Sequence, residues 1–220
     1  VPVEAHRAFL SKLIQSSKQV PHAEGLKSNL AYNLQYLEYL NYTLEDLRLT
    51  SVLWTITVKN FLIVGTSIVE AIFYFVLRNA GLHRENVWSM VRNVSTNEFI
   101  FNNRPAKIEN VLYERLDEPI EEEMNFDAML KKVESRKLLG NDESLYRKLK
   151  YLRRLRNRVH LQLLEKNLDT DWHNFNNKEF LLTKQTLYAV LGSSLFSASA
   201  QELEAYRFLL TASPSPEESN

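Results

Sequence analysis

The strongest constraint on the fold of this chain is one apolar stretch, FLIVGTSIVEAIFYFVL, at residues 61–77. Such a stretch either crosses a membrane or forms the central helix of a packed domain. It is shorter than the ~20 apolar residues that a spanning helix needs, and Glu70 lies near its middle. Lys59 and Arg78 flank it without a bias towards one side. We therefore predict a buried core helix and no membrane as a partner.

Helical periodicity surrounds this stretch. Leucines recur at every third or fourth position between residues 30 and 44, which is the spacing of one helix face. Thr50 or Ser51 can cap the helix that carries the apolar run, and Gly81 suits a left-handed end to it. The patterns predict helices at about residues 3–15, 21–47, 51–79, 121–139, 143–166 and 178–197.

The pattern changes between residues 88 and 123, where short apolar runs flank the sequence NNRP at residues 102–105. Asn and Pro are typical of turns, so we predict a β-hairpin or an irregular insertion at about residues 92–120. Leu112 and Leu116 have a spacing that fits a short helix equally well.

These elements predict an all-α fold, a helical bundle with a small irregular or β-hairpin insertion. A chain of 220 residues with 45% apolar content can bury a sizeable core. Its five Gly and six Pro favour long helices over a turn-rich β architecture. We expect residues 1–49 to pack on a bundle at 50–197, and residues 198–220 to form a short helix and a disordered tail.

Charge and cysteine content exclude several classes of function. Lys plus Arg equals Asp plus Glu at 27 each, so any anionic partner must be bound locally rather than by an overall basic surface. The absence of cysteine excludes disulfides, thiolate zinc sites and cysteine nucleophiles. No histidine spacing suggests a metal site, and no stretch has the order of a signal peptide. We expect a cytoplasmic protein without metal or cofactor.

The segment YLRRLRNRVHLQLL at residues 151–164 has an unusual face. At ~100° per residue, apolar side chains from Leu145 to Leu163 fall in one narrow stripe, and Arg156 occupies the missing position in that stripe. His160 lies one helical turn further on the same side, and Arg153 lies beside both. A guanidinium therefore stands where a bundle would normally have a leucine.

Two explanations of this face remain open. Burying a guanidinium is costly unless it is paired, because the group stays charged. Arg156 therefore either pairs with a carboxylate, for which Glu70 is the plausible partner, or lines a cleft that receives an anion. Arg154 and Arg158 point elsewhere on the wheel and are expected to be solvated, while Asn157 lies at the margin of the first group.

The segment RRLRNRVH at residues 153–160 resembles the motif of the HEPN superfamily of helical-bundle proteins. The order of elements at residues 50–196 is also similar, with a central Glu in an apolar helix, an insertion, and then the basic helix. Members typically have an Arg separated from a His by four to six residues, the first of them often Asn or another polar residue. Arg156 is three residues short of His160, whereas Arg153 and Arg154 meet the spacing, so the arginine that fills this role stays open.

The resemblance implies a metal-independent endoribonuclease, a toxin or a defence or stress effector. It also implies an RNA substrate, a homodimer with the 143–166 helix near the two-fold axis, and a cognate antitoxin or inhibitor protein. His160 would transfer protons while Arg156 or Arg153 stabilises the phosphorane and Asn157 orients the phosphate, giving a 2′,3′-cyclic phosphate. Glu70 and Arg154 would support this site. The alternative is a non-catalytic module that binds RNA, nucleotide or a protein partner.

Overall fold

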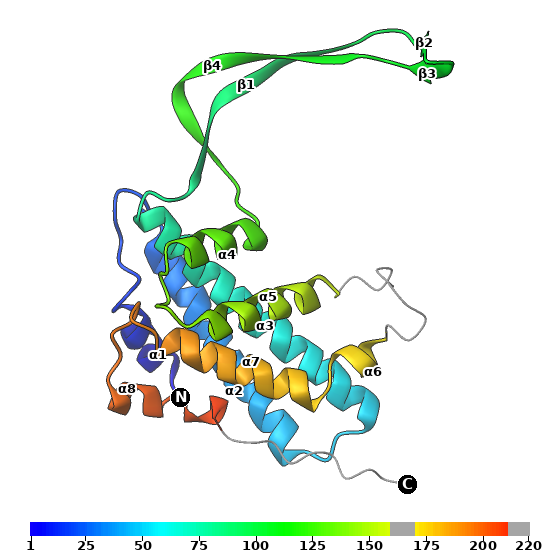
Figure 1. Cartoon of the computed structure of the whole chain (residues 1–220). Helices are drawn as coiled ribbons and strands as arrows, with labels where there is room; N and C mark the ends of the chain where they lie inside the picture. The colour runs from blue at the N-terminus through cyan, green and yellow to red at the C-terminus, as the bar shows by residue number, and fades with distance from the viewer. Residues whose placement is uncertain (159–169, 211–220) are drawn as a thin grey trace. The chain divides into compact units, whose positions relative to one another are not determined.

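The structure is a computed structural model that describes residues 1–158 and 170–210 (Figure 1). Its contacts divide the chain into two units, each described here by itself. The first, the helical unit, comprises Val1–Leu82 and Asn125–Asn220. The second comprises His83–Met124, and we call it the β-arm.

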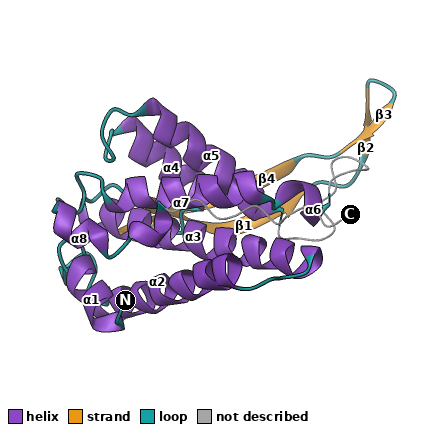
Figure 2. Ribbon diagram, turned by 90° about the horizontal axis from the view of Figure 1, so that it is seen from below, coloured by secondary structure: helices purple, strands orange, loops and turns teal. Residues whose placement is uncertain are grey.

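The helical unit is built around its longest helix. Its elements are α1 (Val3–Leu10), α2 (Ala23–Asp46), α3 (Ser51–Asn79), α4 (Phe126–Ser135), α5 (Glu143–Asn157), α6 (Asp171–Asn174), α7 (Asn177–Leu191), α8 (Ala200–Glu204) and a 3-10 turn (Arg207–Leu209). Helix α3 packs against α2, α4, α5, α6 and α7. In Figure 2, α2, α3 and α7 run alongside one another.

Helix α3 contains the apolar run and supplies much of the core. Phe61, Phe73 and Phe75 are each at most 1% exposed. By length and composition alone this helix could cross a membrane, since its most apolar window has a mean hydropathy of 1.9, but 56% of that window is buried inside the protein. Because each exposed aromatic ring would cost the loss of ~1.5–3 kcal/mol of burial, this helix sets the positions of its neighbours.

The ends of α3 follow the predicted cap residues. Gly81 has φ +64°, and the amides of Gly81 and Leu82 donate to the carbonyls of Arg78 and Leu77 at 3.0 and 2.8 Å. These are the two hydrogen bonds of a Schellman end, which needs a residue in the left-handed region. Thr50 is the N-cap residue, as expected, but its side chain makes no capping hydrogen bond.

Several predicted helix ends were wrong. Helix α4 begins at Phe126, after an Asn125 cap, and stops at Ser135 rather than at residue 139. Lys137 adopts φ +52° and closes the helix four residues before that point, a conformation that its sequence does not favour. Helices α1 and α7 also end early, at Leu10 and Leu191. The predicted helix at 143–166 is α5 up to Asn157, and its residues 159–169 lie outside the described part of the chain.

The β-arm is a long antiparallel ribbon. Strands β1 (Arg84–Ser95) and β4 (Glu109–Glu122) pair along their length, and β2 (Phe99–Phe101) pairs with β3 (Arg104–Ala106) at its end (Figure 1). Asn102 and Asn103 form the turn with φ +49° and +60°. Two consecutive positive φ angles are those of a type I′ turn, so the turn predicted at these asparagines is present.

The β-arm shows that the all-α assignment was wrong. Of the described residues, 57% are helical and 16% lie in strands. The insertion is also longer than the predicted 92–120, because pairing begins at Arg84 and Glu122. Leu112 and Leu116 lie in β4 rather than in a helix. Pairing between residues so far apart in the sequence leaves no local periodic signal, so the sequence pattern understated the strand content.

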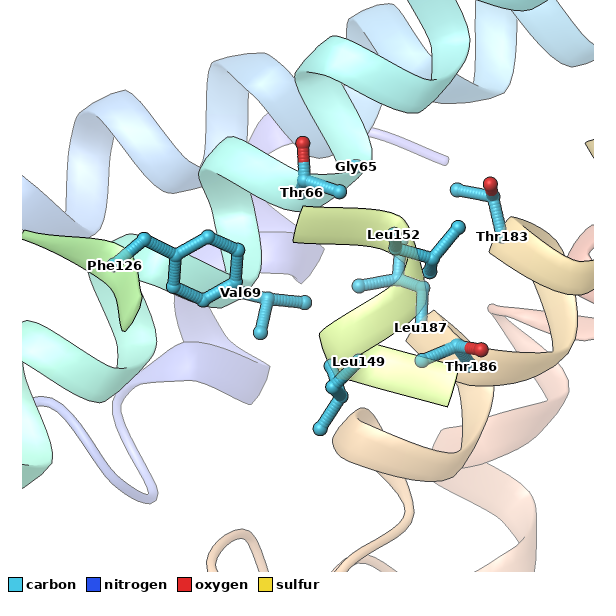
Figure 3. Close-up of a pocket in the computed structure, with 9 residues that line it drawn as sticks. All are labelled: Gly65, Thr66, Val69, Phe126, Leu149, Leu152, Thr183, Thr186 and Leu187. Atoms are coloured by element: carbon cyan, nitrogen blue, oxygen red, sulfur yellow. The ribbon is translucent and has the colours of Figure 1, made fainter. Parts of the chain in front are cut away.

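A small cavity lies where α3, α4, α5 and α7 meet (Figure 3). Its volume is about 10 Å³, which is enough for at most one water molecule. The hydroxyls of Thr66, Thr183 and Thr186, on its lining, each donate to the carbonyl four residues earlier. The lining therefore offers a ligand no unpaired hydroxyl, and the cavity is a packing gap in the core.

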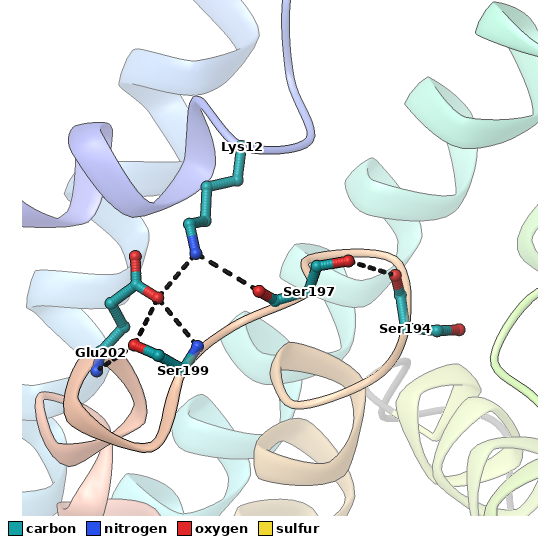
Figure 4. Close-up of polar contacts among 5 residues, drawn as sticks. All are labelled: Lys12, Ser194, Ser197, Ser199 and Glu202. Atoms are coloured by element: carbon teal, nitrogen blue, oxygen red, sulfur yellow. Dashed lines mark hydrogen bonds and ion pairs between the residues drawn. The ribbon is translucent and has the colours of Figure 1, made fainter.

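Polar contacts hold the start of α8 against the segment that follows α1 (Figure 4). Ser199 and Glu202 form a capping box, and Lys12 Nζ donates to Glu202 Oε2 at 2.6 Å. The hydrogen bond from Lys12, together with those from Ser199, lowers the pKa of Glu202 to about 2. Glu202 therefore stays ionised above that pH, and these contacts stabilise the folded state until it is protonated.

His6 is fully buried where α1 meets the residues after α8. Its Nδ1 lies 3.2 Å from the Tyr206 hydroxyl, while Nε2 has no hydrogen-bond partner among the described residues. Burial lowers the pKa of His6 to about 4, and the carboxylate of Glu38 opposes this shift only in part. The folded protein therefore holds this imidazole neutral.

We expect the free energy of unfolding to fall as the pH drops from about 6.5 to 4. An unfolded chain binds a proton at His6 near pH 6.5, whereas the folded chain resists it until about pH 4, so acid favours unfolding by on the order of 3 kcal/mol. Urea titrations at pH 7, 6, 5 and 4 measure this slope. His6→Gln should flatten it, and His22→Gln, at an exposed histidine, should leave it unchanged.

Candidate functional site

Helix α5 carries most of the residues that the sequence singled out. Asp142 caps it by accepting a hydrogen bond from the Ser144 amide at 2.8 Å, and the hydrogen bonds from Ser144 lower the pKa of Asp142. The buried face consists of Leu145, Leu149, Leu152 and Leu155. This face fixes the rotation of the helix, so the positions of its basic side chains follow from the leucines.

Arg156 occupies the interrupted apolar stripe and pairs with Glu70 of α3. Its Nη1 lies 2.5 Å from Glu70 Oε2, and the two side chains are 31% and 25% exposed. The guanidinium also lies 5.9 Å from the centre of the Phe126 ring. The stripe tolerates an arginine here because its head reaches a carboxylate rather than the apolar core. The intramolecular pair is therefore the arrangement that the structure contains.

Arg153 also turns towards a carboxylate. Its Nε lies 3.2 Å from Asp127 Oδ1 on α4, although this buried atom makes no hydrogen bond of good geometry. A hydrogen bond from Lys131, with a smaller contribution from Arg153, lowers the pKa of Asp127. One carboxylate thus balances two cations at this point, and the local charge stays positive.

The remaining motif residues lie on other faces. Arg154 is exposed, and its guanidinium lies 5.9 Å from the Tyr151 ring of the same helix. Asn157 is exposed as well, and Arg158 Nη1 donates to Asn174 Oδ1 at 3.5 Å. His160 lies outside the described residues, so its distance to these groups stays open. The structure therefore separates Arg156 and Arg153, which have carboxylate partners, from Arg154 and Asn157.

An open basic pocket of about 530 Å³ lies between α4 and α5. It is lined by Asp127, Leu130, Lys131, Arg147, Lys150, Arg153 and Arg154. Lys131 and Lys150 pair with Asp127 and Glu134, both at 2.7 Å. Among the described residues, no carboxylate pairs with Arg147 or Arg154. These two guanidiniums can therefore bind an anion that enters the pocket without first losing a partner.

The sequence interpretation missed three of these cations, Lys131, Arg147 and Lys150. Their signal was the spacing of Arg147, Lys150 and Arg154, which repeats at three and four residues and therefore follows one helix face. The segment from Glu143 to Arg158 contains seven Lys or Arg and one Glu, in a chain with no net charge. The positive charge that the whole composition lacks is concentrated on α5.

Metal chemistry has no visible site in the described part of the chain. No group of three or more His, Cys, Asp or Glu side chains there is arranged to hold an ion.

Comparison with known proteins gives no further guidance. No protein-family model matches the chain, and no curated protein or solved structure matches it significantly. The resemblance to the HEPN superfamily therefore stays a prediction, and the function has to be inferred from the residues themselves.

The ion pair between Arg156 and Glu70 yields a stability prediction. Arg156→Met should leave a partly buried carboxylate without its partner and lower the free energy of unfolding by about 1–2 kcal/mol, since both groups keep some solvent exposure. Urea denaturation of purified variants measures the change.

The double variant Arg156→Met with Glu70→Leu should recover most of that loss, because neither charge is then unpaired. Arg154→Met is the matched control and should change stability by less than about 0.5 kcal/mol. An equal loss in both arginine variants would contradict the pairing.

Proposed function

We propose that this protein is a metal-independent endoribonuclease of the HEPN type that binds RNA phosphates in the basic pocket between α4 and α5. The observation that carries the proposal is the local charge of α5, where Arg147 and Arg154 have no carboxylate partner in an otherwise neutral chain. Guanidinium groups bind phosphate oxygens through forked hydrogen bonds. An anionic polymer is the partner whose charge matches this surface.

Arg154 is the arginine best suited to the catalytic role. Arg156 and Arg153 already pair with Glu70 and Asp127, so moving either to a phosphate would leave a carboxylate unpaired. Arg154 has no such partner among the described residues and is separated from His160 by five residues, which fits the spacing in the HEPN superfamily. Arg156 then acts as a positioning residue that fixes α5 on α3.

The proposed reaction needs no group beyond these side chains. His160 accepts the proton of the 2′-hydroxyl, whose oxygen attacks the adjacent phosphorus. Arg154 stabilises the added charge on the phosphorane, and the exposed Asn157 orients the phosphate. The bond to the 5′-oxygen breaks, and that oxygen takes up a proton. The products are a 2′,3′-cyclic phosphate and a 5′-hydroxyl.

A second function is binding without cleavage. The ion pair between Arg156 and Glu70 favours it, because one arginine of the motif then has a structural role. RNA would still bind in the basic pocket, and the protein would act as an RNA-binding module. Measurements of binding and of cleavage separate the two functions.

Removing the two unpaired guanidiniums should weaken RNA binding. For Arg147→Gln with Arg154→Gln we expect the slope of log K against log salt to become less negative by about 1.4, which is 0.7 for each lost phosphate contact on a single strand. Fluorescence anisotropy with a labelled single-stranded RNA at several salt concentrations measures the slope. Arg48→Gln, at an exposed arginine outside the pocket, is the control. Equal slopes in both variants would show that RNA binds elsewhere.

Cleavage should depend on His160 and Arg154. In excess EDTA, we expect His160→Ala and Arg154→Ala each to slow cleavage of single-stranded RNA by about 100-fold or more, with little change in melting temperature. Detection of a 2′,3′-cyclic phosphate end identifies the chemistry. Arg156→Met should mainly lower the melting temperature. Binding by a wild-type protein that never cleaves would favour the second function, and cleavage that survives His160→Ala would rule out the proposed mechanism.

A further inference from the structure

The β-arm exposes most of its apolar side chains. Along its four strands, all of which the structure describes, no residue is buried. Thirteen of the 24 exposed large apolar residues in the described chain lie in these 42 residues, each 37–70% exposed. A two-stranded ribbon of this kind is at best marginally stable in water without a further layer. The arm therefore needs a covering surface.

The exposed apolar area is large enough for a stable interface. At roughly 200 Å² for each large side chain, about half exposed, the thirteen residues present on the order of 1,000 Å². The largest apolar patch on a typical monomer is about 300–600 Å². A stable protein interface buries about 800 Å² on each partner, so the arm alone can supply one side of it.

One face of the ribbon is more apolar than the other. Cross-strand partners share a face, and the partners Met90 and Tyr113 place Trp88 and Val111 on the same side as themselves. These four side chains, which we call the apolar stripe, are 40–61% exposed. The opposite face alternates Val94 and Leu112 with Ser89, Arg92, Asn110 and Glu114. The stripe is therefore the face that a partner would cover.

Charge is distributed unevenly along the arm. Its base, residues 83–86 and 114–124, carries seven acidic and two basic residues. Its distal part, residues 87–113, carries three basic and two acidic residues. Two such arms aligned in parallel would bring seven acidic residues against seven. Aligned in opposite directions, each acidic base would face a weakly basic distal part.

We propose that the β-arms of two copies of this chain pack stripe against stripe, in opposite directions, and form a homodimer. A two-fold axis through such a contact gives both copies the same interface, so the stripe has to complement only itself. The arm carries a net charge of −4, which disfavours nucleic acid or an anionic membrane as the covering surface. This interface rests on the arm alone and holds whatever reaction α5 performs.

The oligomeric state tests the proposal. Light scattering on the eluting full-length chain should give the mass of a dimer at about 20 µM. The variant Trp88→Thr, Met90→Thr, Tyr113→Thr keeps strand-forming residues but removes the stripe, and it should raise the dimer dissociation constant at least 100-fold. The control Val94→Thr, Leu112→Thr changes the opposite face and should stay a dimer.

A spin label tests the direction of the arms. The chain has no cysteine, so Asn103→Cys places a single label at the tip of each arm. At about 3.3 Å per residue, tips at opposite ends of two overlapping arms should lie roughly 40–50 Å apart, whereas parallel arms would bring them within roughly 20 Å. Double electron–electron resonance measures this distance in the dimer.

Three results would overturn the inference. A wild-type chain that stays a monomer at 100 µM would exclude the dimer, and sedimentation of that monomer with anionic vesicles would assign the stripe to lipid. A dimer that survives the triple variant as well as it survives the control would place the interface elsewhere. A short distance between the tips would exclude the opposite orientation. Unchanged helical circular dichroism in each variant shows that the helical unit remains folded.

Discussion

The burial of α3 is the constraint on which the helical unit depends. A helix of this length with an apolar run cannot leave its aromatic side chains in water, so α2, α4, α5 and α7 must cover it. Glu70 belongs to the same helix, and its carboxylate requires a cation where α5 crosses. Arg156 supplies that cation. The charge pair thus fixes how α5 lies on the core, while the leucines of α5 provide the contact.

The same pairing decides which basic groups remain available. Once Arg156 and Arg153 turn towards Glu70 and Asp127, the cations on the outer face of α5 have few carboxylates left to pair with. A helix held by two charge pairs on its inner side can keep a positive outer surface without a loss of stability. Structural and ligand-binding roles are then divided between neighbouring arginines of one motif, according to the face on which each lies.

Local patterns predicted the long helices, the Asp142 cap and the Gly81 end, because each depends on residues within one or two turns. Glu70 as the partner of Arg156 was also foreseeable, since each is an unusual charge in an apolar setting. The β-arm was understated because Arg84 and Glu122 pair across 38 positions. Lys131 was missed because the pocket needs α4 and α5 side by side, an arrangement that no single helix shows.

The neutral composition conceals two units of opposite charge. The helical unit carries 22 basic and 18 acidic residues, and the β-arm carries 5 and 9, which gives net charges of +4 and −4 on the ranges 1–82 with 125–220 and 83–124. At physiological salt, charges act over about 8 Å, so a partner senses the local patch rather than the total. A neutral chain can therefore present a cationic pocket on α5 and an acidic ribbon elsewhere. Composition alone excludes a uniformly basic protein, but it does not exclude an anion-binding site on one helix.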